Sequence, residues 1–241
     1  DVKIKIAWAK YNWAGAGKTE TLPFDFEHVG GGVTTDYDRY FSQVNKIKAR
    51  FKPVTLAGSL ADVTGDIAMK DTSIRFGGAA FAPDGAITGN GGVIYSPLSG
   101  SQTVTLSNAN AYTGSTRIAG ATAVTLEDAE AIPAGSEVTV EGAALSVAEG
   151  IAAATPKLTV TGAATLTFAD GASLEADDID LSAAETVTVV AAEGAKWMKV
   201  CRALTKNELK KFAPGDGFRV RQDADGWLFA ERVPGVILLI R

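Results

Sequence analysis

Cysteine and histidine are almost missing from this sequence: its 241 residues include only Cys201 and His28. A single cysteine cannot close an intramolecular disulfide, and a zinc centre needs several Cys or His ligands. One histidine is also a poor basis for serine-type catalysis, which needs a histidine held between a carboxylate and a nucleophile. Cys201 follows the apolar run Trp197–Val200, and we expect it to be a buried thiol.

Long apolar runs and an excess of positive charge are also lacking. The longest apolar run, Val236–Ile240, is far shorter than the roughly 20 residues that cross a bilayer, so we expect no transmembrane segment in this chain. The formal charge of −5 argues against a nucleic-acid partner. The segment Gly15–Thr19 (GAGKT) has Asn12 where a phosphate-binding loop needs its first glycine. We therefore expect no nucleotide and no other cofactor.

Charge is unevenly distributed along the chain. Ser101–Gly194 contains 13 acidic and 2 basic residues, whereas the flanks on either side contain more basic residues than acidic ones. The central segment is therefore of a different kind from its neighbours.

Short strands dominate this central segment. Runs such as Thr103–Leu106 (TVTL), Glu137–Val140 (EVTV), Ala164–Phe168 (ATLTF) and Thr186–Val190 (TVTVV) alternate apolar residues with Thr, Ser or charged residues. This period of two is typical of a half-buried strand. Gly, Ala and Asx residues separate the runs, which indicates tight turns between very short strands.

The spacing of the strands favours a solenoid. Core candidates recur at steps of 7, 13, 8, 8 and 5 residues, at Val138, Leu145, Leu158, Leu166, Leu174 and Ile179. These steps indicate units of roughly seven residues, with a gap of about two units at the Ala-rich stretch Ile151–Thr155. A coil with about three such faces would stack these side chains rung upon rung, whereas a β-sandwich normally spaces its turns 8–12 residues apart. We therefore predict an all-β fold, a parallel β-helix with short helices and capping strands in its flanks.

One segment of the centre carries a recognisable pattern. Val104–Leu126 resembles the autotransporter-associated β-strand repeat at Asn110, Tyr112, Thr113, Gly114, Thr116, Gly120 and Leu126. Ile118 stands one residue later than the usual position, and Ala123 replaces the usual glycine before the last strand. The resemblance implies a right-handed parallel β-helix and a passenger-type exported protein, often of the bacterial cell surface.

The composition divides the chain into three parts. We predict an N-terminal flank and cap at 1–100, solenoid repeats at 101–202 and a C-terminal cap at 203–241. In the first part, residues 36–51 show helical spacing, and Asn90-Gly91 is typical of a hairpin turn. In the last part, Thr205 and Glu208 form a capping-box pattern at the start of a short helix.

Two groups of side chains are candidate binding sites. Asp177, Asp178 and Asp180, with Glu175 nearby, form the densest acidic cluster, which could be a solvated strand or a cation site. Trp8, Tyr11 and Trp13 could stack on sugar rings, or they could pack in a core.

Two functions remain open at this point. The first is an exported, extracellular or cell-surface β-helix module with a structural or adhesin-like role and no catalytic residues. The alternative is a carbohydrate-binding or lyase-like β-helix protein. Under either function, we expect the partner of this chain to be a surface polysaccharide or a protein. A lyase needs a base beside its metal, and Arg117 and Lys157 are the only basic residues of Ser101–Gly194.

Overall fold

The computed structural model describes residues 54–56, 65–69 and 72–233, together with the backbone of four two-residue strands nearer the N-terminus. The chain divides into two compact units, Asp1–Lys52 and Pro53–Arg241. In the first unit, β1 pairs antiparallel with β4 and β2 with β3. The bounds of these strands are β1 Ile6–Ala7, β2 Tyr11–Asn12, β3 Thr19–Glu20 and β4 Pro23–Phe24. The expected helix at 36–51 lies outside the described residues.

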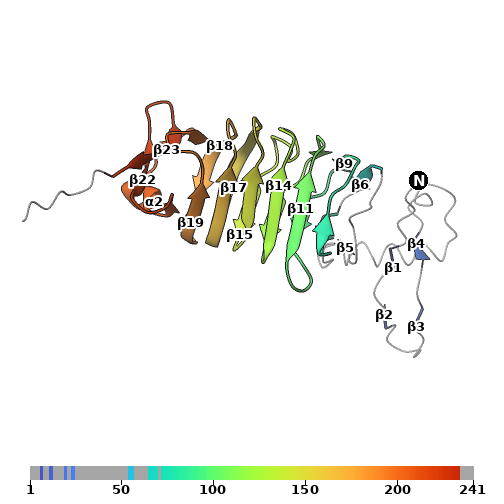
Figure 1. Ribbon diagram of the computed structural model, residues 1–241. Coiled ribbons are helices and arrows are strands. Elements are labelled where there is room, and N and C mark those ends of the chain that lie inside the picture. The colour runs from blue at the N-terminus through green and yellow to red at the C-terminus, as the bar shows by residue number, and fades with distance from the viewer. Residues whose placement is uncertain are drawn as a thin grey trace, which may run out of the picture. The chain divides into compact units, whose positions relative to one another are not determined.

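The second unit is a β-solenoid of about seven turns, which confirms the expected parallel β-helix. Its strands stack side by side in chain order (Figure 1). Sheet I is parallel from its first strand to β20. It consists of β5 Val54–Leu56, β7 Ile74–Phe76, β10 Val93–Tyr95, β13 Thr116–Ala119, β15 Val138–Glu141, the first part of β17 Ala152–Phe168, β18 Ser173–Asp180 and β20 Lys196–Val200.

Sheet II forms a second face of the coil and is also parallel. It consists of β8 Ala80–Phe81, β11 Gln102–Leu106, β14 Thr122–Leu126, β16 Ala144–Val147, the end of β17, β19 Ala184–Val190 and β21 Phe212–Ala213. Sheet III, the third face, consists of β6 Ile67–Met69, β9 Ile87–Gly89 and β12 Ala111–Tyr112. Since β17 pairs with strands of both sheet I and sheet II, it continues around the corner between these two sheets.

The register explains the spacing seen in the sequence. One coil advances the chain by 19 residues between the paired Ile74 and Val93, and by 24 between Leu174 and Met198. Within each strand, alternate residues face inward, so that the paired residues Leu145 and Leu166 lie one above the other and are almost fully buried. The core is therefore a stack of rungs: Val, Leu and Ile fill the middle coils, and buried aromatic rings fill the earlier and later ones, with Phe76, Phe81 and Tyr95 near the start and Phe168 and Trp197 near the end.

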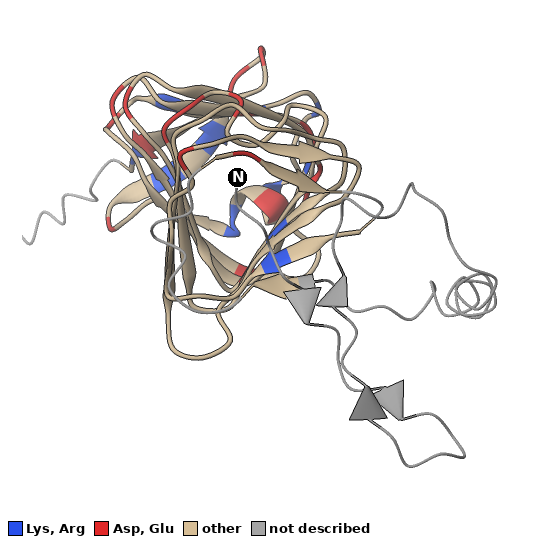
Figure 2. Ribbon diagram, turned by 90° about the vertical axis from the view of Figure 1, so that its right-hand side faces the viewer, with Lys and Arg blue, Asp and Glu red and all other residues tan. Residues whose placement is uncertain are grey.

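The corners repeat as regularly as the strands do. Three turns between sheet II and the next coil read Ala-Glu/Asp-Gly, at Ala148–Gly150, Ala169–Gly171 and Ala192–Gly194. In each turn the fourth residue donates its N–H to the carbonyl of the alanine, as Ile151 does to Ala148 at 3.2 Å. Gly150 has φ of +70°, which an L side chain rarely adopts. Figure 2, which looks along the solenoid axis, shows acidic residues in the turns at the corners of the coils.

The residues of the repeat-like segment cluster at one corner of the coil. The buried side chain of Asn110 accepts the N–H of Ile87 at 2.7 Å and donates to the carbonyl of Ala131 at 2.6 Å, so it links three successive coils. The Tyr112 hydroxyl lies 2.5 Å from the Thr116 hydroxyl, which lies 2.9 Å from that of Ser136. A Cβ atom on Gly114 would lie 2.4 Å from the backbone nitrogen of Gly92. Each residue type thus serves the close stacking of this corner.

The Asn110→Ala variant is expected to lose about 1–3 kcal/mol of unfolding free energy, because it leaves the N–H of Ile87 and the carbonyl of Ala131 without a partner in the core. Urea denaturation followed by circular dichroism measures the loss. The control is Asn108→Ala, which removes one 3.3 Å bond to the carbonyl of Pro83 and should cost less. Equal midpoints for the two variants would contradict the bridging role.

Two expectations from the sequence need correction. The solenoid does not begin at residue 101, since the parallel ladder already includes β5 at Val54–Leu56. Asn90-Gly91 is not a hairpin turn: β9 pairs with β6 and β12, and β10 pairs with β7 and β13. Asparagine-glycine favours tight turns of several kinds. Here it forms the corner between β9 on sheet III and β10 on sheet I.

The C-terminal end of the solenoid has a different construction. The short helix α2, Lys206–Leu209, begins at Thr205 with the predicted capping box. Strands β22, Phe218–Gln222, and β23, Trp227–Arg232, form an antiparallel hairpin, and β23 pairs antiparallel with β20. The hairpin therefore covers the edge of β20, the last strand of the parallel ladder of sheet I. No described helix has the length and apolar character needed to cross a membrane.

Candidate functional site

A pocket of about 510 Å³ opens between sheet I and the C-terminal segment that contains α2. Its lining includes Asp178 and Asp180 of β18, together with Ile179, which lies between them in the sequence, and Leu181, which follows them. Ile179 and Leu181 are buried, so the two aspartates share the outward face of β18. The charged residues that line the pocket are Lys157, Asp178, Asp180, Arg202, Glu208 and Lys211.

The register of sheet I brings Lys157 to the acidic strand. Lys157 on β17 is the pairing partner of Asp178 on β18, so the ammonium and the carboxylate start from adjacent rungs. The pKa of Asp178 is lowered chiefly by a hydrogen bond from Arg202, and that of Asp180 chiefly by hydrogen bonds from Ser182. Attraction to Lys157 and Arg202 lowers both pKa values further.

Arg202 connects the last coils to the cap. Its Nε donates to Oδ1 of Asp178 at 2.8 Å, and its terminal nitrogen donates to Oε1 of Glu208 at 2.6 Å and to the carbonyl of Ile179 at 2.5 Å. The other oxygen of Glu208 accepts the backbone N–H and the hydroxyl of Thr205, both at 2.8 Å. The guanidinium is thus engaged in holding α2 against β18.

The pKa of Glu208 falls to about 2, chiefly because Arg202 donates a hydrogen bond to its carboxylate and secondly because the Thr205 backbone does so. A carboxyl whose pKa is depressed on folding stabilises the folded state above its unfolded pKa, and this contribution disappears as the pH falls through the folded value. Wild type should therefore be more stable than the Glu208→Gln variant at pH 6, and the difference should vanish between about pH 4.5 and pH 2.

Thermal melting of both proteins across this pH range tests the assignment. The matched control is Glu185→Gln, which removes an exposed carboxylate of the neighbouring strand β19. A stability difference between wild type and Glu208→Gln that persists unchanged at pH 2 would contradict the role of the ion pair.

The structure separates the three aspartates that the sequence groups together. Asp178 and Asp180 face the pocket, whereas Oδ1 of Asp177 lies 3.6 Å from Sγ of Cys201. Among the described residues, no three His, Cys, Asp or Glu side chains converge as metal ligands would. The reason is geometric: each carboxylate is turned toward a different partner, Arg202, Ser182 or Cys201.

The remaining candidates have mixed outcomes. Cys201 is exposed rather than buried, because it lies just after the end of β20, outside the alternation that buries Trp197 and Val200. The pKa of the Cys201 thiol is nevertheless raised, first by local desolvation and then by the hydrogen bond to Asp177. The backbone of Tyr11 belongs to β2. Its side chain, Trp8 and Trp13 lie outside the described residues, as does His28.

The sequence reasoning missed Arg202 and the outer face of the hairpin. Arg202 has no local pattern, because its partners Asp178 and Glu208 come from two different elements. The hairpin did carry a signal: Trp227 and Phe229 alternate with the buried Leu228 on β23, and Arg219 and Arg221 flank the buried Val220 on β22. Comparison with family models, curated proteins and solved structures finds no match for this chain.

Proposed function

We propose that this chain is an exported bacterial cell-surface module with a structural or adhesin-like role and no catalytic activity. The observation that carries the proposal is the uninterrupted ladder of about seven coils, closed by a hairpin at its C-terminal end. Such a scaffold presents side chains on a regular lattice and needs no cleft to act as a spacer or contact surface. The likeness of Val104–Leu126 to passenger-type repeats supports the export and the surface location.

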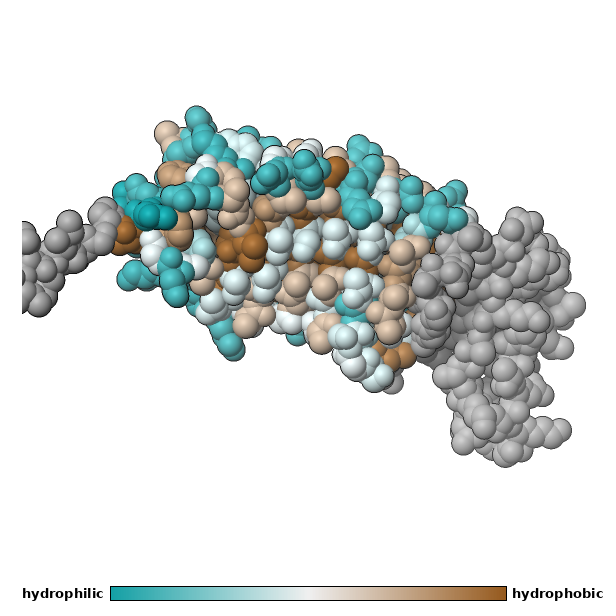
Figure 3. Space-filling view, viewed as in Figure 1, coloured by the Kyte–Doolittle hydropathy of each residue, from teal (hydrophilic) through white to brown (hydrophobic). Residues whose placement is uncertain are grey.

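The outer surface of sheet II fits a role in contact rather than chemistry. Its outward residues run in two ladders along the pairing register. One is Thr103, Ala123, Ala144, Thr165 and Thr188, and the other is Thr105, Thr125, Ser146, Thr167 and Val190. None of them is charged, and Figure 3 shows white to brown residues across this face with hydrophilic residues gathered mainly at its margins.

The charged groups near the pocket support the non-catalytic role. Arg202 is held by Asp178 and Glu208, and Asp180 accepts the N–H of Ser182. A general base needs access to the proton that it removes and a pKa suited to that task. The pKa values of Asp178 and Glu208 are instead lowered by their partners, as in a stabilising ion-pair network.

The pocket is the observation that favours the alternative, a carbohydrate-binding or lyase-like protein. It places Lys157 beside Asp178 and Asp180 at a concave surface of a size that ligands use. A lyase would require Lys157 to abstract a proton from a bound acidic sugar.

The two functions are separated by one pair of measurements. Display of the full chain on a non-adherent bacterial cell should increase attachment to a surface coated with polysaccharide or host protein. Incubation of the purified chain with acidic polysaccharides, with and without calcium, should give no unsaturated product by ultraviolet absorbance. Product formation that is lost in Lys157→Met but kept in Lys206→Met would contradict the proposal and establish the alternative.

A further inference from the structure

The outer face of the C-terminal hairpin combines aromatic rings with cations. Trp227 and Phe229 lie two residues apart on β23, and both are half-buried, whereas Leu228 between them is fully buried. Successive side chains of a strand point to opposite faces, so the two rings share the face that is turned away from the core. Two residues along a strand span about 7 Å, which places the rings side by side along β23.

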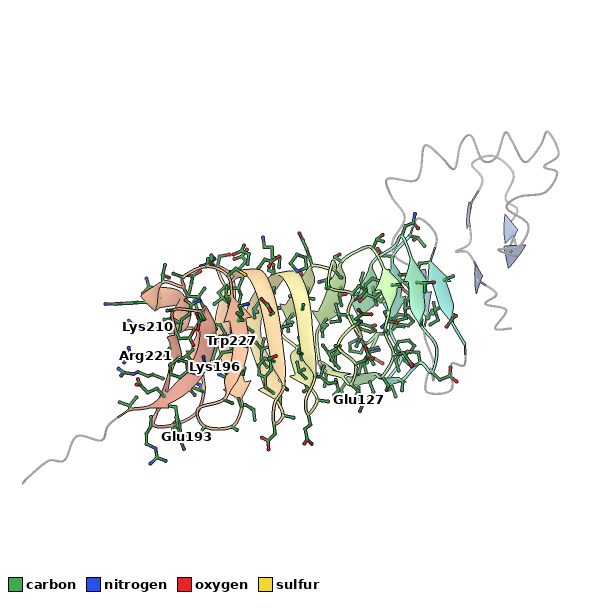
Figure 4. All side chains as sticks on the ribbon, turned by 90° about the horizontal axis from the view of Figure 1, so that it is seen from above. Glu127, Glu193, Lys196, Lys210, Arg221 and Trp227 are labelled. Atoms are coloured by element: carbon green, nitrogen blue, oxygen red, sulfur yellow. The ribbon has the colours of Figure 1, made fainter. Side chains whose placement is uncertain are left out.

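Cations flank these rings on both sides. On β20, Lys199 pairs with Trp227 and Lys196 pairs with Phe229. On β22, Arg221 pairs with Phe229 and Arg219 pairs with Glu231. Figure 4 shows Lys196, Arg221 and Trp227 at this end of the solenoid. We call the six residues the aromatic strip: Trp227, Phe229, Lys196, Lys199, Arg219 and Arg221.

Carboxylates hold the cations of the aromatic strip in place. Glu231 accepts from Arg219 at 2.7 Å and from Arg221 at 2.8 Å, Asp223 lies 2.8 Å from Lys196, and Glu175 lies 2.5 Å from Lys199. The hydrogen bonds to Asp223 and Glu175 raise the pKa of Lys196 and Lys199. Asp225 also attracts Lys196 and Lys199, so four cations face four carboxylates and the strip is close to neutral beside a strongly acidic solenoid.

This mixture of groups selects for a particular chemistry. The faces of Trp and Phe stack on flat apolar surfaces such as pyranose rings, and arginine binds carboxylates with two parallel bonds. The carboxylates of Glu231 and Asp223 accept hydrogen bonds from hydroxyl groups, and they repel the closely spaced phosphates of a nucleic acid, which needs many unpaired cations. A polymer that has pyranose rings, hydroxyls and carboxylates matches all three features.

We propose that the aromatic strip binds an anionic polysaccharide, with sugar rings stacked on Trp227 and Phe229 and uronate carboxylates directed toward Arg221 and Lys199. The proposal rests on the proposed role as a surface interaction module and names the class of its partner. The site is separate from the pocket lined by Lys157, because none of the six residues lines that pocket.

The test is binding of the purified full chain to polygalacturonate fragments by isothermal titration calorimetry. A neutral galactan and single-stranded DNA of similar length are the comparison ligands. Trp227→Thr and Arg221→Thr are the test variants, since threonine suits a strand. The matched control is Arg117→Thr, which removes an arginine that is also exposed and ion-paired, to Glu141 on sheet I. Thermal melting confirms that each variant is folded.

Binding of polygalacturonate that weakens at least about tenfold in Trp227→Thr and in Arg221→Thr, but stays unchanged in Arg117→Thr, supports the proposal. Arg221→Thr should also reduce the dependence of binding on salt. No binding, equal loss in all three variants, or DNA binding as tight as that of polygalacturonate would overturn it. Failure of the displayed chain to attach to any coated surface, with polygalacturonate binding by the purified chain intact, would contradict the proposed function and leave the role of the aromatic strip standing.

Discussion

The Leu166→Ala variant is expected to lose about 2–5 kcal/mol of unfolding free energy, because it opens a cavity in the middle of the stacked core. Leu166 is fully buried, and its pairing partners in the adjacent coils are Leu145 and Val189, which are also buried. The coil above and the coil below cannot close the gap without moving their own ladders, so relaxation should recover little. Chemical denaturation of the full chain measures the loss as a lower midpoint.

The neighbouring Thr167 supplies the control. Its side chain points to the outer face of the same strand, so Thr167→Ala should change the unfolding free energy by less than about 0.5 kcal/mol. An unchanged midpoint in Leu166→Ala, or equal losses in both variants, would show that the alternation along β17 does not define the core.

Removal of residues 203–241 is expected to make the protein self-associate. The deletion uncovers the edge of β20, which now pairs with β23, and the edge of β19, which now pairs with β21. Open strand edges are templates for pairing with another chain. The deletion also removes Phe212, whose ring centroid lies 5.6 Å from that of the fully buried Trp197. It removes Glu208 as well, so Arg202 keeps Asp178 as a partner but loses its ion pair to the cap.

Sedimentation velocity and thermal melting of a chain ending at Arg202 test this expectation. Each kcal/mol lost should lower the melting temperature by about 2–4 °C in a domain of this size. The matched control ends at Val233 and keeps every described strand, so it should behave as the intact chain does. If the chain ending at Arg202 stays folded, soluble and unchanged in oligomeric state, residues 203–241 are an appendage and not a cap.

The strands and their inward residues could be predicted because alternation is a local property. Leu145, Leu158 and Leu166 all lie in the core as their position in the pattern indicated. The capping box was likewise predictable, because its two partners, Thr205 and Glu208, lie within four consecutive residues. Both depend on side chains that are close in the sequence and differ sharply in polarity.

The corners and the pocket could not be predicted, for two different reasons. The Ala-Glu/Asp-Gly turns consist of small residues that are common everywhere, and their recurrence is clear only once the register aligns Gly150 with Asp170 of the next coil. The pocket depends on Arg202 reaching Asp178 across 24 residues and Glu208 across six. No pattern within one element contains that information. The error at Asn90-Gly91 has the same origin, since a local turn signal does not say which strands pair afterwards.

The ladder of coils has a mechanical consequence. Each coil bonds only to the coil before it and the coil after it, so tension applied to the two ends of the solenoid would load the outermost rung first and peel coils away singly. Each event would release about 20 residues, the step from Val138 to Leu158, which corresponds to roughly 70 Å of extended chain. A tether built in this way yields in small increments and dissipates work at every one of them, whereas a globular domain of equal length gives way in a single rupture.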